Sequence, residues 1–432
     1  MTIYDEAMQM KEELVACRRD LHAHPELAWT EFRTASHVAK SLKALGYEVL
    51  MGDACMKADE MMGVPDKAEL SRAMGRAIKE GADPELVKKM EGGKTGVVGI
   101  MHFAKPGKTV GLRFDMDCLL VEENPTDAHR PTRDGFASTH PGLMHACGHD
   151  GHTAIGLGVA RLIAAHKDEM AGTVKLCFQP GEEGVMGARG MVASGIVDDV
   201  DYFLSGHIGL GNGENNSLVC MTEGFLATSK IDAFFTGKPA HAGANPQNGR
   251  NALLAAAQAS LALHTISRHS DGPSRINVGI LKAGTGRNVI PDNAVIKFET
   301  RGGSTAINEF MEGEARRMIK AAADMYGVTV KMVARGSAAS GNSSPDMGEE
   351  VYEVVKGLGV YSDIEKNHTV SGSEDCSYFM SRVQDHGDKA VYMLYGTEEA
   401  SGHHTSEFDF NEDVLPLSVY TVTELVKHFT NK

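Results

Sequence analysis

The sequence predicts an α/β protein: a mostly parallel sheet covered by helices, with a second, smaller unit inserted into it. Two observations lead to this class. Short apolar runs of strand type alternate with helical segments along most of the chain, which is typical of a parallel sheet covered on both faces. Near residue 228 the order changes to β-α-β-β-α-β, the split ferredoxin-like arrangement. The chain of 432 residues is long enough for two or three domains.

The first half of the chain carries the helix and strand signals of the large sheet. Helical apolar spacing covers residues 13–27 and 31–49, and the second helix should stop at Gly46. Residues 55–95 are polar and are expected to form a helical insertion on the surface. The predicted strands are 95–103, 109–117, 173–179, 201–207 and 389–396, and 152–166 is a helix that is apolar almost all round.

The inserted unit repeats a different pattern. Its expected elements are a strand at 229–237, a helix at 248–268, strands at 275–284 and 294–302, a helix at 305–327 and a strand at 329–336. An insertion of this kind makes the surrounding domain discontinuous. We therefore expect a catalytic domain of residues 1–227 plus 337–432 and a lid or dimerisation domain of residues 228–336.

Composition excludes several classes of function. The net charge is −15 and no block of lysine or arginine occurs, which disfavours binding to nucleic acid or to an anionic membrane. The first twenty residues are charged throughout, so no secretory signal is expected, and no apolar run approaches the roughly 18 residues of a membrane span. Seven scattered cysteines without a CxxC pair indicate a reduced, cytoplasmic protein.

The stretch "MHACGHDGHTA", residues 144–154, is the first indication of chemistry. Cys147 and His149 are separated by one glycine, on a turn before a helix. A thiolate and an imidazole placed in this way can bind one metal ion jointly.

Further ligand-type residues follow other predicted strands. Glu182 and Glu183 come after a Pro-Gly turn, His207 ends an apolar strand, and His403 and His404 form a pair after the last strand. In a strand-like segment the two adjacent carboxylates should point opposite ways, one to a metal and one to substrate and water. The crevice of an open α/β sheet lies along the carboxyl edge of its strands. We therefore expect a metal site at this edge, with ligands enough for two ions if one ligand bridges.

Asp115 and Asp117, in "GLRFDMDCLL", stand at another strand end. Each could ligate directly or could hold a ligand histidine by a hydrogen bond, and we favour the supporting role. His22 and His24 are expected to organise the fold near the site.

These motifs together resemble one family. "RRDLHAHPEL", "HACGHD", "FQPGEEG", "GRNVIPDNA", "GSED" and "HHTSEFDFNED" match its pattern over nearly the whole chain. The sequence resembles the aminoacylase/carboxypeptidase G superfamily of dinuclear metallohydrolases (peptidase family M20), in its branch of bacterial and plant amidohydrolases. The resemblance implies hydrolysis of N-acyl amino acids, with p-aminobenzoyl-glutamate as the expected substrate and indole-3-acetyl-aspartate or another N-acyl amino acid as the alternative.

The resemblance also assigns the metal centre. It implies two divalent ions per protomer, Mn²⁺ or Zn²⁺, and Glu182 as the general base. His404 is preferred to His403 because Phe408 follows it at the family's spacing. The implied ligands are Cys147, His149, Glu183, His207 and His404.

Three lid residues complete the implied site. His241, in "GKPAHAG", matches a histidine that reaches the active site of a partner protomer and stabilises the oxyanion. Asn288 and Arg301 match residues that hold the substrate carboxylate, although "ETR" replaces the more usual approach to that arginine. A homodimer is therefore expected, or a hetero-oligomer with a paralogous chain.

Two other functions compete with this interpretation. Cys147 could be the nucleophile of a cysteine hydrolase with His149 as base, but one intervening residue usually points such side chains apart or at a common ion. A chelator abolishes activity under the metal hypothesis and spares it under this one. The chain could instead be a non-catalytic, metal-bound partner of another protein, against which the retention of Glu182 argues; turnover by the purified single chain discriminates the two.

Overall fold

The computed structural model describes residues 1–211 and 213–432 and divides them into two compact units. Unit 1 comprises Met1–Glu223, Asn342–Val370 and Asp375–Lys432, and unit 2 comprises Gly224–Gly341 and Ser371–Glu374. Each unit has its own sheet. The boundaries expected from the sequence lie within a few residues of these limits, and their meaning for independent folding stays a prediction.

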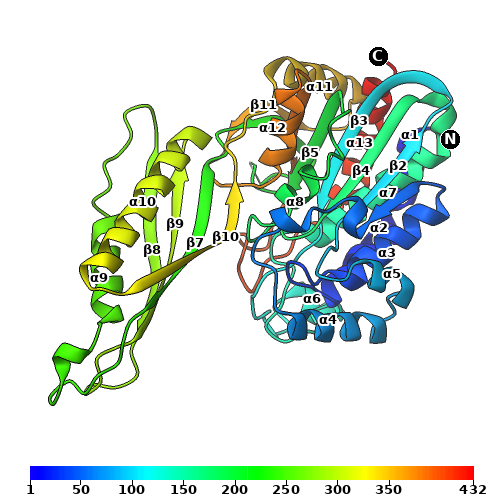
Figure 1. The fold of residues 1–432 in the computed structure, drawn as a ribbon. Coiled ribbons are helices and arrows are strands. Elements are labelled where there is room, and N and C mark those ends of the chain that lie inside the picture. The colour runs from blue at the N-terminus through cyan, green and yellow to red at the C-terminus, as the bar shows by residue number, and fades with distance from the viewer. Residues whose placement is uncertain (212) are drawn as a thin grey trace. The chain divides into compact units, whose positions relative to one another are not determined.

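Unit 1 is built on an eight-stranded sheet with the order β1-β2-β4-β3-β5-β12-β6-β11 (Figure 1). Its strands are β1 Glu48–Met51, β2 Val97–His102, β3 Lys105–Asp115, β4 Ala171–Gln179, β5 Tyr202–Ile208, β6 Ser217–Glu223, β11 Asp363–Thr369 and β12 Lys389–Gly396. The four central strands β4, β3, β5 and β12 pair in parallel. The carboxyl ends of these strands therefore meet at one edge of the sheet.

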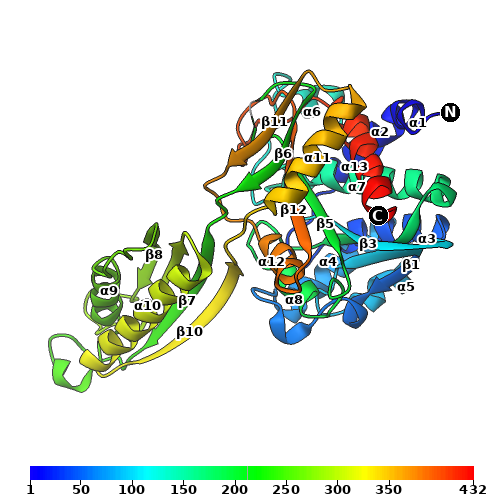
Figure 2. The same cartoon turned by 90° about the horizontal axis from the view of Figure 1, so that it is seen from above.

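Helices cover both faces of this sheet (Figure 2). The helices α7 and α13 pack against β3 and β4, while α12 packs against β5 and β12 from the other face. The helices of unit 1 are α1 Ile3–Gln9, α2 Lys11–Ala23, α3 Phe32–Ala44, α4 Lys67–Lys79, α5 Pro84–Lys89, α6 Arg130–Asp134, α7 His149–Ala165, α8 Ala188–Val192, α11 Pro345–Leu358, α12 Ser377–Asp385 and α13 Val414–Thr430. None of the described helices combines the length and the apolar composition that a bilayer-spanning segment requires.

The central strands are buried because helices lie on both sides of them. Every residue of β5 after its first is buried, as is every residue of β12 after its first. The helix α7 is likewise enclosed, with 13 buried residues named along its length, which explains its lack of a polar face. Strands of this kind read as continuous apolar runs, which is why the sequence reveals them.

Unit 2 is a four-stranded antiparallel sheet with the order β10-β7-β9-β8. Its elements follow the chain as β7 Ala227–Thr236, α9 Ala252–Leu263, β8 Ser274–Ala283, β9 Asn293–Gly302, α10 Thr305–Met325 and β10 Thr329–Ala338. The two helices pack together and against the sheet, and their shared core includes Ala256, Ile296, Phe298, Met311 and Ile319. The expected fold class, including the inserted β-α-β-β-α-β unit, is confirmed.

Candidate metal centre

The turn at Gly148 brings Cys147 and His149 together at the start of α7. Gly148 has a φ of +88°, a left-handed conformation that favours glycine. The Nδ1–H of His149 donates to the main-chain oxygen of Asp117 at 2.9 Å, so that Nε2 is left to face the site. The glycine between the two residues therefore directs a thiol and an imidazole to one point.

A first group of candidate ligands joins Cys147 and His149 to His207. The ligand atoms of all three lie within 4.8 Å of one another and are buried. The Sγ of Cys147 is 3.5 Å from Nε2 of His207, near the end of β5. The Nδ1–H of His207 donates to the main-chain oxygen of Ile208 at 2.7 Å. Each imidazole is therefore held by one nitrogen and presents the other.

A second group joins the same Cys147 to Glu183 and His404, again within 4.8 Å. The Nε2 of His404 lies 3.4 Å from Oε2 of Glu183. His404 has a φ of +64°, unusual for a residue with a side chain, and its N–H donates to the main-chain oxygen of Ala146 at 2.7 Å. Strained backbone of this kind gathers at functional sites. The five side chains expected as ligands thus share one place, and the thiol of Cys147 belongs to both groups.

Glu182 and Glu183 lie on a turn after β4 and not on a strand. The N–H groups of Glu182 and Glu183 donate to the two carboxylate oxygens of Asp117 at 2.9 and 3.0 Å. Both glutamate carboxylates approach Nε2 of His149, at 3.9 and 3.8 Å. The expectation that they point opposite ways is therefore wrong, because a turn held by one aspartate does not follow the alternation of a strand.

The electrostatics of the centre disfavour its negative groups as long as no cation is present. Burial, together with the charge of Glu183, raises the pKa of the Cys147 thiol well above its ordinary value. Burial and the charge of Asp117 raise the pKa of Glu183 to about 7. Burial lowers the pKa of His207 well below its usual range, and the neighbouring His152 adds to this effect.

Two buried atoms at the centre lack a hydrogen-bond partner among the residues described. They are Nε2 of His149 and Oε1 of Glu183. Buried polar atoms are rarely left unpaired, and each needs an explanation. A divalent cation supplies one, because thiolate, imidazole and carboxylate are all ligands of such ions. The residues present therefore fit a metal.

Asp115 has its oxygens committed elsewhere, in agreement with the supporting role expected for it. One oxygen accepts from Nδ1 of His152 at 2.6 Å and the other from the guanidinium of Arg113 at 2.6 Å. The Nε2 of His152 in turn accepts from the N–H of Ile208 at 2.8 Å, beside His207. The sequence did not single out His152. Only its spacing three residues after His149, on the same helix face, could have indicated it.

The two late histidines both reach the centre. The Nδ1 of His403 is 3.5 Å from Sγ of Cys147, and its Nε2 is 3.1 Å from Glu399. The ring of Phe408, whose spacing led to the choice of His404, packs against His403 at 4.7 Å between centroids. His404 is more exposed, with 55% of its side chain accessible compared with 12% for His403. The choice of His404 as the ligand stays a prediction.

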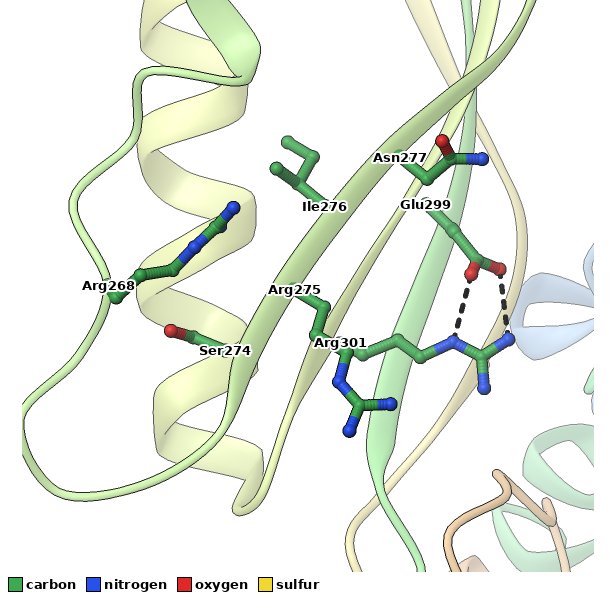
Figure 3. Close-up of a pocket in the computed structure, with 7 residues that line it drawn as sticks. All are labelled: Arg268, Ser274, Arg275, Ile276, Asn277, Glu299 and Arg301. Atoms are coloured by element: carbon green, nitrogen blue, oxygen red, sulfur yellow. Dashed lines mark hydrogen bonds and ion pairs between the residues drawn. The ribbon is translucent and has the colours of Figure 1, made fainter.

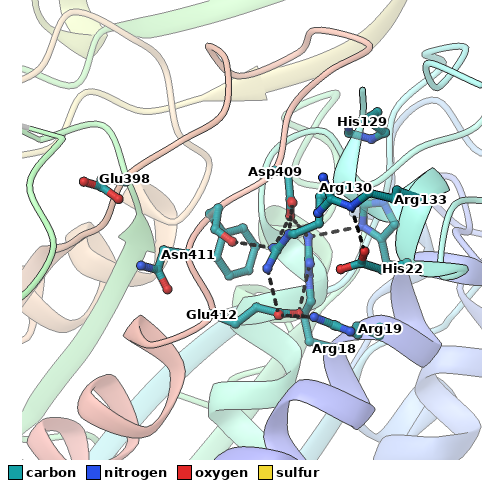
Figure 4. A network of polar contacts seen from close by, with 12 residues as sticks. Arg18, Arg19, His22, His129, Arg130, Arg133, Glu398, Asp409, Asn411 and Glu412 are labelled. Atoms are coloured by element: carbon teal, nitrogen blue, oxygen red, sulfur yellow. Dashed lines mark hydrogen bonds and ion pairs between the residues drawn. The ribbon is translucent and has the colours of Figure 1, made fainter. Parts of the chain in front are cut away.

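A buried ionic network braces the centre from below (Figure 4). Arg18 is fully buried and contacts Asp150, Asp409 and Glu412 at 2.8, 3.0 and 3.2 Å. Asp150 also accepts from His22 at 2.8 Å. Arg18 thereby joins α2 to the residue after His149 and to the loop after His404. The motif "RRDLHAHPEL" owes its histidine to this network.

The three lid residues lie in unit 2. The segment of His241 pairs with that of Val289, and the N–H of Ala242 donates to the main-chain oxygen of Asn288 at 3.0 Å. Arg301 is at the far end of β9 from Asn288. Because β9 has 10 residues, the two are separated by about 30 Å. One chain therefore does not bring both residues to a single carboxylate.

Fold and centre together define the class: an enzyme of the amidohydrolase and peptidase type, with residues that could hold metal ions. The chain belongs to peptidase family M20/M25/M40, whose pattern matches residues 111–428.

Similar proteins cover nearly the whole chain. It is 48% identical to an indole-3-acetyl-aspartic acid hydrolase of Enterobacter agglomerans over 98% of this chain and 97% of that protein. It is 47% identical to one of the named subunits of the p-aminobenzoyl-glutamate hydrolase of Escherichia coli over 95% and 94%. The crystal structure of an aminobenzoyl-glutamate utilization protein from Klebsiella pneumoniae matches with a TM-score of 0.85 and 38% identity, over 99% and 98% of the two chains.

Proposed function

We propose that this enzyme hydrolyses the amide bond of N-acyl amino acids whose amino-acid half is acidic. The first candidate substrate is p-aminobenzoyl-glutamate, which would give p-aminobenzoate and glutamate. The relative from Escherichia coli carries this activity in its name, and the one from Enterobacter agglomerans supports indole-3-acetyl-aspartate as the alternative.

The observation that carries the proposal is the shared thiol of Cys147. Because it belongs to both ligand groups, it is the candidate bridge of a two-ion centre, with His149 and His207 on one side and Glu183 and His404 on the other. Divalent ions bound there would lower the pKa of water and polarise the amide carbonyl. Thiolate and imidazole suit zinc, and carboxylate also suits manganese, so both metals are candidates.

Glu182 is the proposed general base. Its main-chain N–H is held by Asp117, and its carboxylate lies beside His149 at the mouth of the centre. In this position it takes a proton from the attacking water and delivers it to the leaving nitrogen. The resemblance to the family supports this role.

The proposed substrate contacts in unit 2 need a second chain. His241 is assigned to the oxyanion, and Asn288 and Arg301 to the substrate carboxylate. Since Asn288 and Arg301 lie at opposite ends of β9, one substrate can meet both only if they come from different protomers. We therefore infer a dimer, either of two identical chains or with a paralogue. All seven cysteines are unpaired, which supports the cytoplasm as its compartment.

Metal removal and reloading test the chemistry. The chelated protein should lose activity toward p-aminobenzoyl-glutamate, and Mn²⁺ or Zn²⁺ should restore it, with about two ions bound per chain by elemental analysis. Indole-3-acetyl-aspartate and N-acetyl-glutamate complete the substrate panel. Full activity after verified metal removal would favour the cysteine-hydrolase alternative. Turnover of no member of the panel would refute the proposed function.

Mixing of inactive variants tests the shared site. Glu182→Gln and His241→Ala are each expected to be inactive alone. Mixed after dissociation, they should regain activity, because a hybrid dimer contains one site with both residues intact. An active protein that stays monomeric at assay concentration would contradict the dimer.

A further inference from the structure

A depression of about 520 Å³ in unit 2 is lined by three arginines (Figure 3). Arg268 comes from the segment between α9 and β8, Arg275 from β8 and Arg301 from β9. Glu299 is the one carboxylate in its lining, so the depression carries an excess of positive charge.

Two of these arginines face each other across the sheet. In the antiparallel register of β8 and β9, Arg275 is paired directly with Arg301. Directly opposite side chains lie on the same face of a sheet, with Cβ atoms about 5 Å apart, and like charges at such positions are destabilising. The sheet therefore bears a cost for this pair in the absence of an anion.

The available carboxylate balances only one of the two. Glu299 holds Arg301 in a two-pronged contact, with Nε to Oε1 at 2.9 Å and Nη2 to Oε2 at 3.3 Å. Arg275 is exposed and makes no hydrogen bond or ion pair with any residue described. Its guanidinium therefore remains available to an anionic ligand, beside an arginine that has already been oriented.

We propose that Arg275 determines specificity by binding the side-chain carboxylate of an acidic N-acyl amino acid, next to Arg301. This inference rests on the proposed function, in which Arg301 takes the α-carboxylate of the same substrate. A dicarboxylate with a short carbon chain meets both guanidinium groups at once and offsets their repulsion. Planar guanidinium groups match carboxylates in paired hydrogen bonds, which a neutral amide side chain does not reproduce.

Binding of glutarate tests the pocket without any hydrolysis. Glutarate carries the two carboxylates of glutamate and no amide bond. By isothermal titration calorimetry, Arg275→Gln should weaken its binding at least tenfold, whereas Arg275→Lys should keep part of it. The control is Arg317→Gln, which removes one positive charge from α10, where Arg317 pairs with Glu314 and is 62% exposed. Equal effects of Arg275→Gln and Arg317→Gln, or no effect of either, would overturn the proposal.

Hydrolysis then tests the specificity. With p-aminobenzoyl-glutamate and its glutamine analogue as a matched pair, Arg275→Gln should lower kcat/KM for the glutamate substrate by about 30- to 100-fold, mainly through KM. For the glutamine analogue the fall should be at most about threefold. An equal fall for both substrates would overturn the proposal.

The two failures are distinguishable. If glutarate binds through Arg275 but no N-acyl amino acid is hydrolysed, the proposed function is wrong and the dicarboxylate pocket remains. If p-aminobenzoyl-glutamate is hydrolysed but Arg275→Gln leaves the glutamate-to-glutamine preference unchanged, the proposed function remains and the role of Arg275 is wrong. Removal of a like-charge contact should not destabilise the fold, so the thermal midpoint of Arg275→Gln should not fall below that of the wild type.

Discussion

The candidate metal centre of unit 1 and the arginine pocket of unit 2 are both concentrations of charge, but they are built in opposite ways. At the metal centre the side chain of His149 is fully buried, and its orientation is set by hydrogen bonds to the main chain. In the pocket Arg275 is exposed, and its position is set only by the register of two strands. One site is surrounded by fixed dipoles, and the other faces water.

This difference separates chemistry from recognition. Buried charges interact strongly and are costly when a partner is lost, so the centre is tied to the stability of unit 1. Exposed charges are screened by water and contribute little to folding, so the pocket can change without such a cost. The expected effects of substitutions follow this contrast.

The largest effect is expected at Glu182. Glu182→Gln keeps the size of the side chain but removes the base, so kcat should fall by about 10³- to 10⁴-fold. Metal content, measured by elemental analysis, should stay that of the wild type. Glu183→Gln is the matched control and should lose metal instead. If Glu182→Gln retained a tenth of the activity, Glu182 would not be the base.

Next comes the buried network under the centre. Arg18→Met leaves Asp150, Asp409 and Glu412 without their shared cation, and should lower the free energy of unfolding by about 3–5 kcal/mol. Urea denaturation measures this change.

Arg317→Gln in unit 2 is the comparison, since it breaks an exposed helical pair, which should cost less than about 0.5 kcal/mol. Similar losses in both variants would remove the contrast between the buried and the exposed charges.

A smaller effect is expected at Asp117, which holds both glutamate N–H groups. Asp117→Asn replaces one accepting oxygen by a donor and should lower metal affinity by about 10- to 100-fold. Competition with a fluorescent chelator measures the affinity. Unchanged affinity would show that the glutamate turn holds its shape without this carboxylate.

The mildest effect is expected from pH. Burial opposes the ionised forms of Asp150, Asp409 and Glu412, but their cationic partners outweigh it and lower the pKa of each carboxyl. Their contribution to stability is therefore present above an ordinary carboxyl pKa of about 4 and is lost as the pH falls through their lowered values. Unfolding of the metal-free protein should change by under about 1 kcal/mol from pH 7 to 5 and steeply below pH 4. A stability that rises on acidification would contradict this.

The strands that the sequence missed share a physical reason. The strands β6 and β11 lie at the margin of the large sheet, where β6 runs antiparallel to β12. The edge strand β11, "DIEKNHT", is polar and has no buried residue, so it lacks the apolar run that marks the central strands. Its strand conformation comes from pairing with β6 rather than from its own composition.

The sequence alone determined the class of fold and the candidate ligands, because apolar periodicity and a glycine between Cys147 and His149 are local properties of the chain. Only the tertiary structure decided that one thiol belongs to two ligand groups, that both glutamates turn toward His149, and that Arg275 stands opposite Arg301. These relations join segments that are far apart in the chain. They depend on turn geometry and strand register, which long-range packing sets and local composition does not.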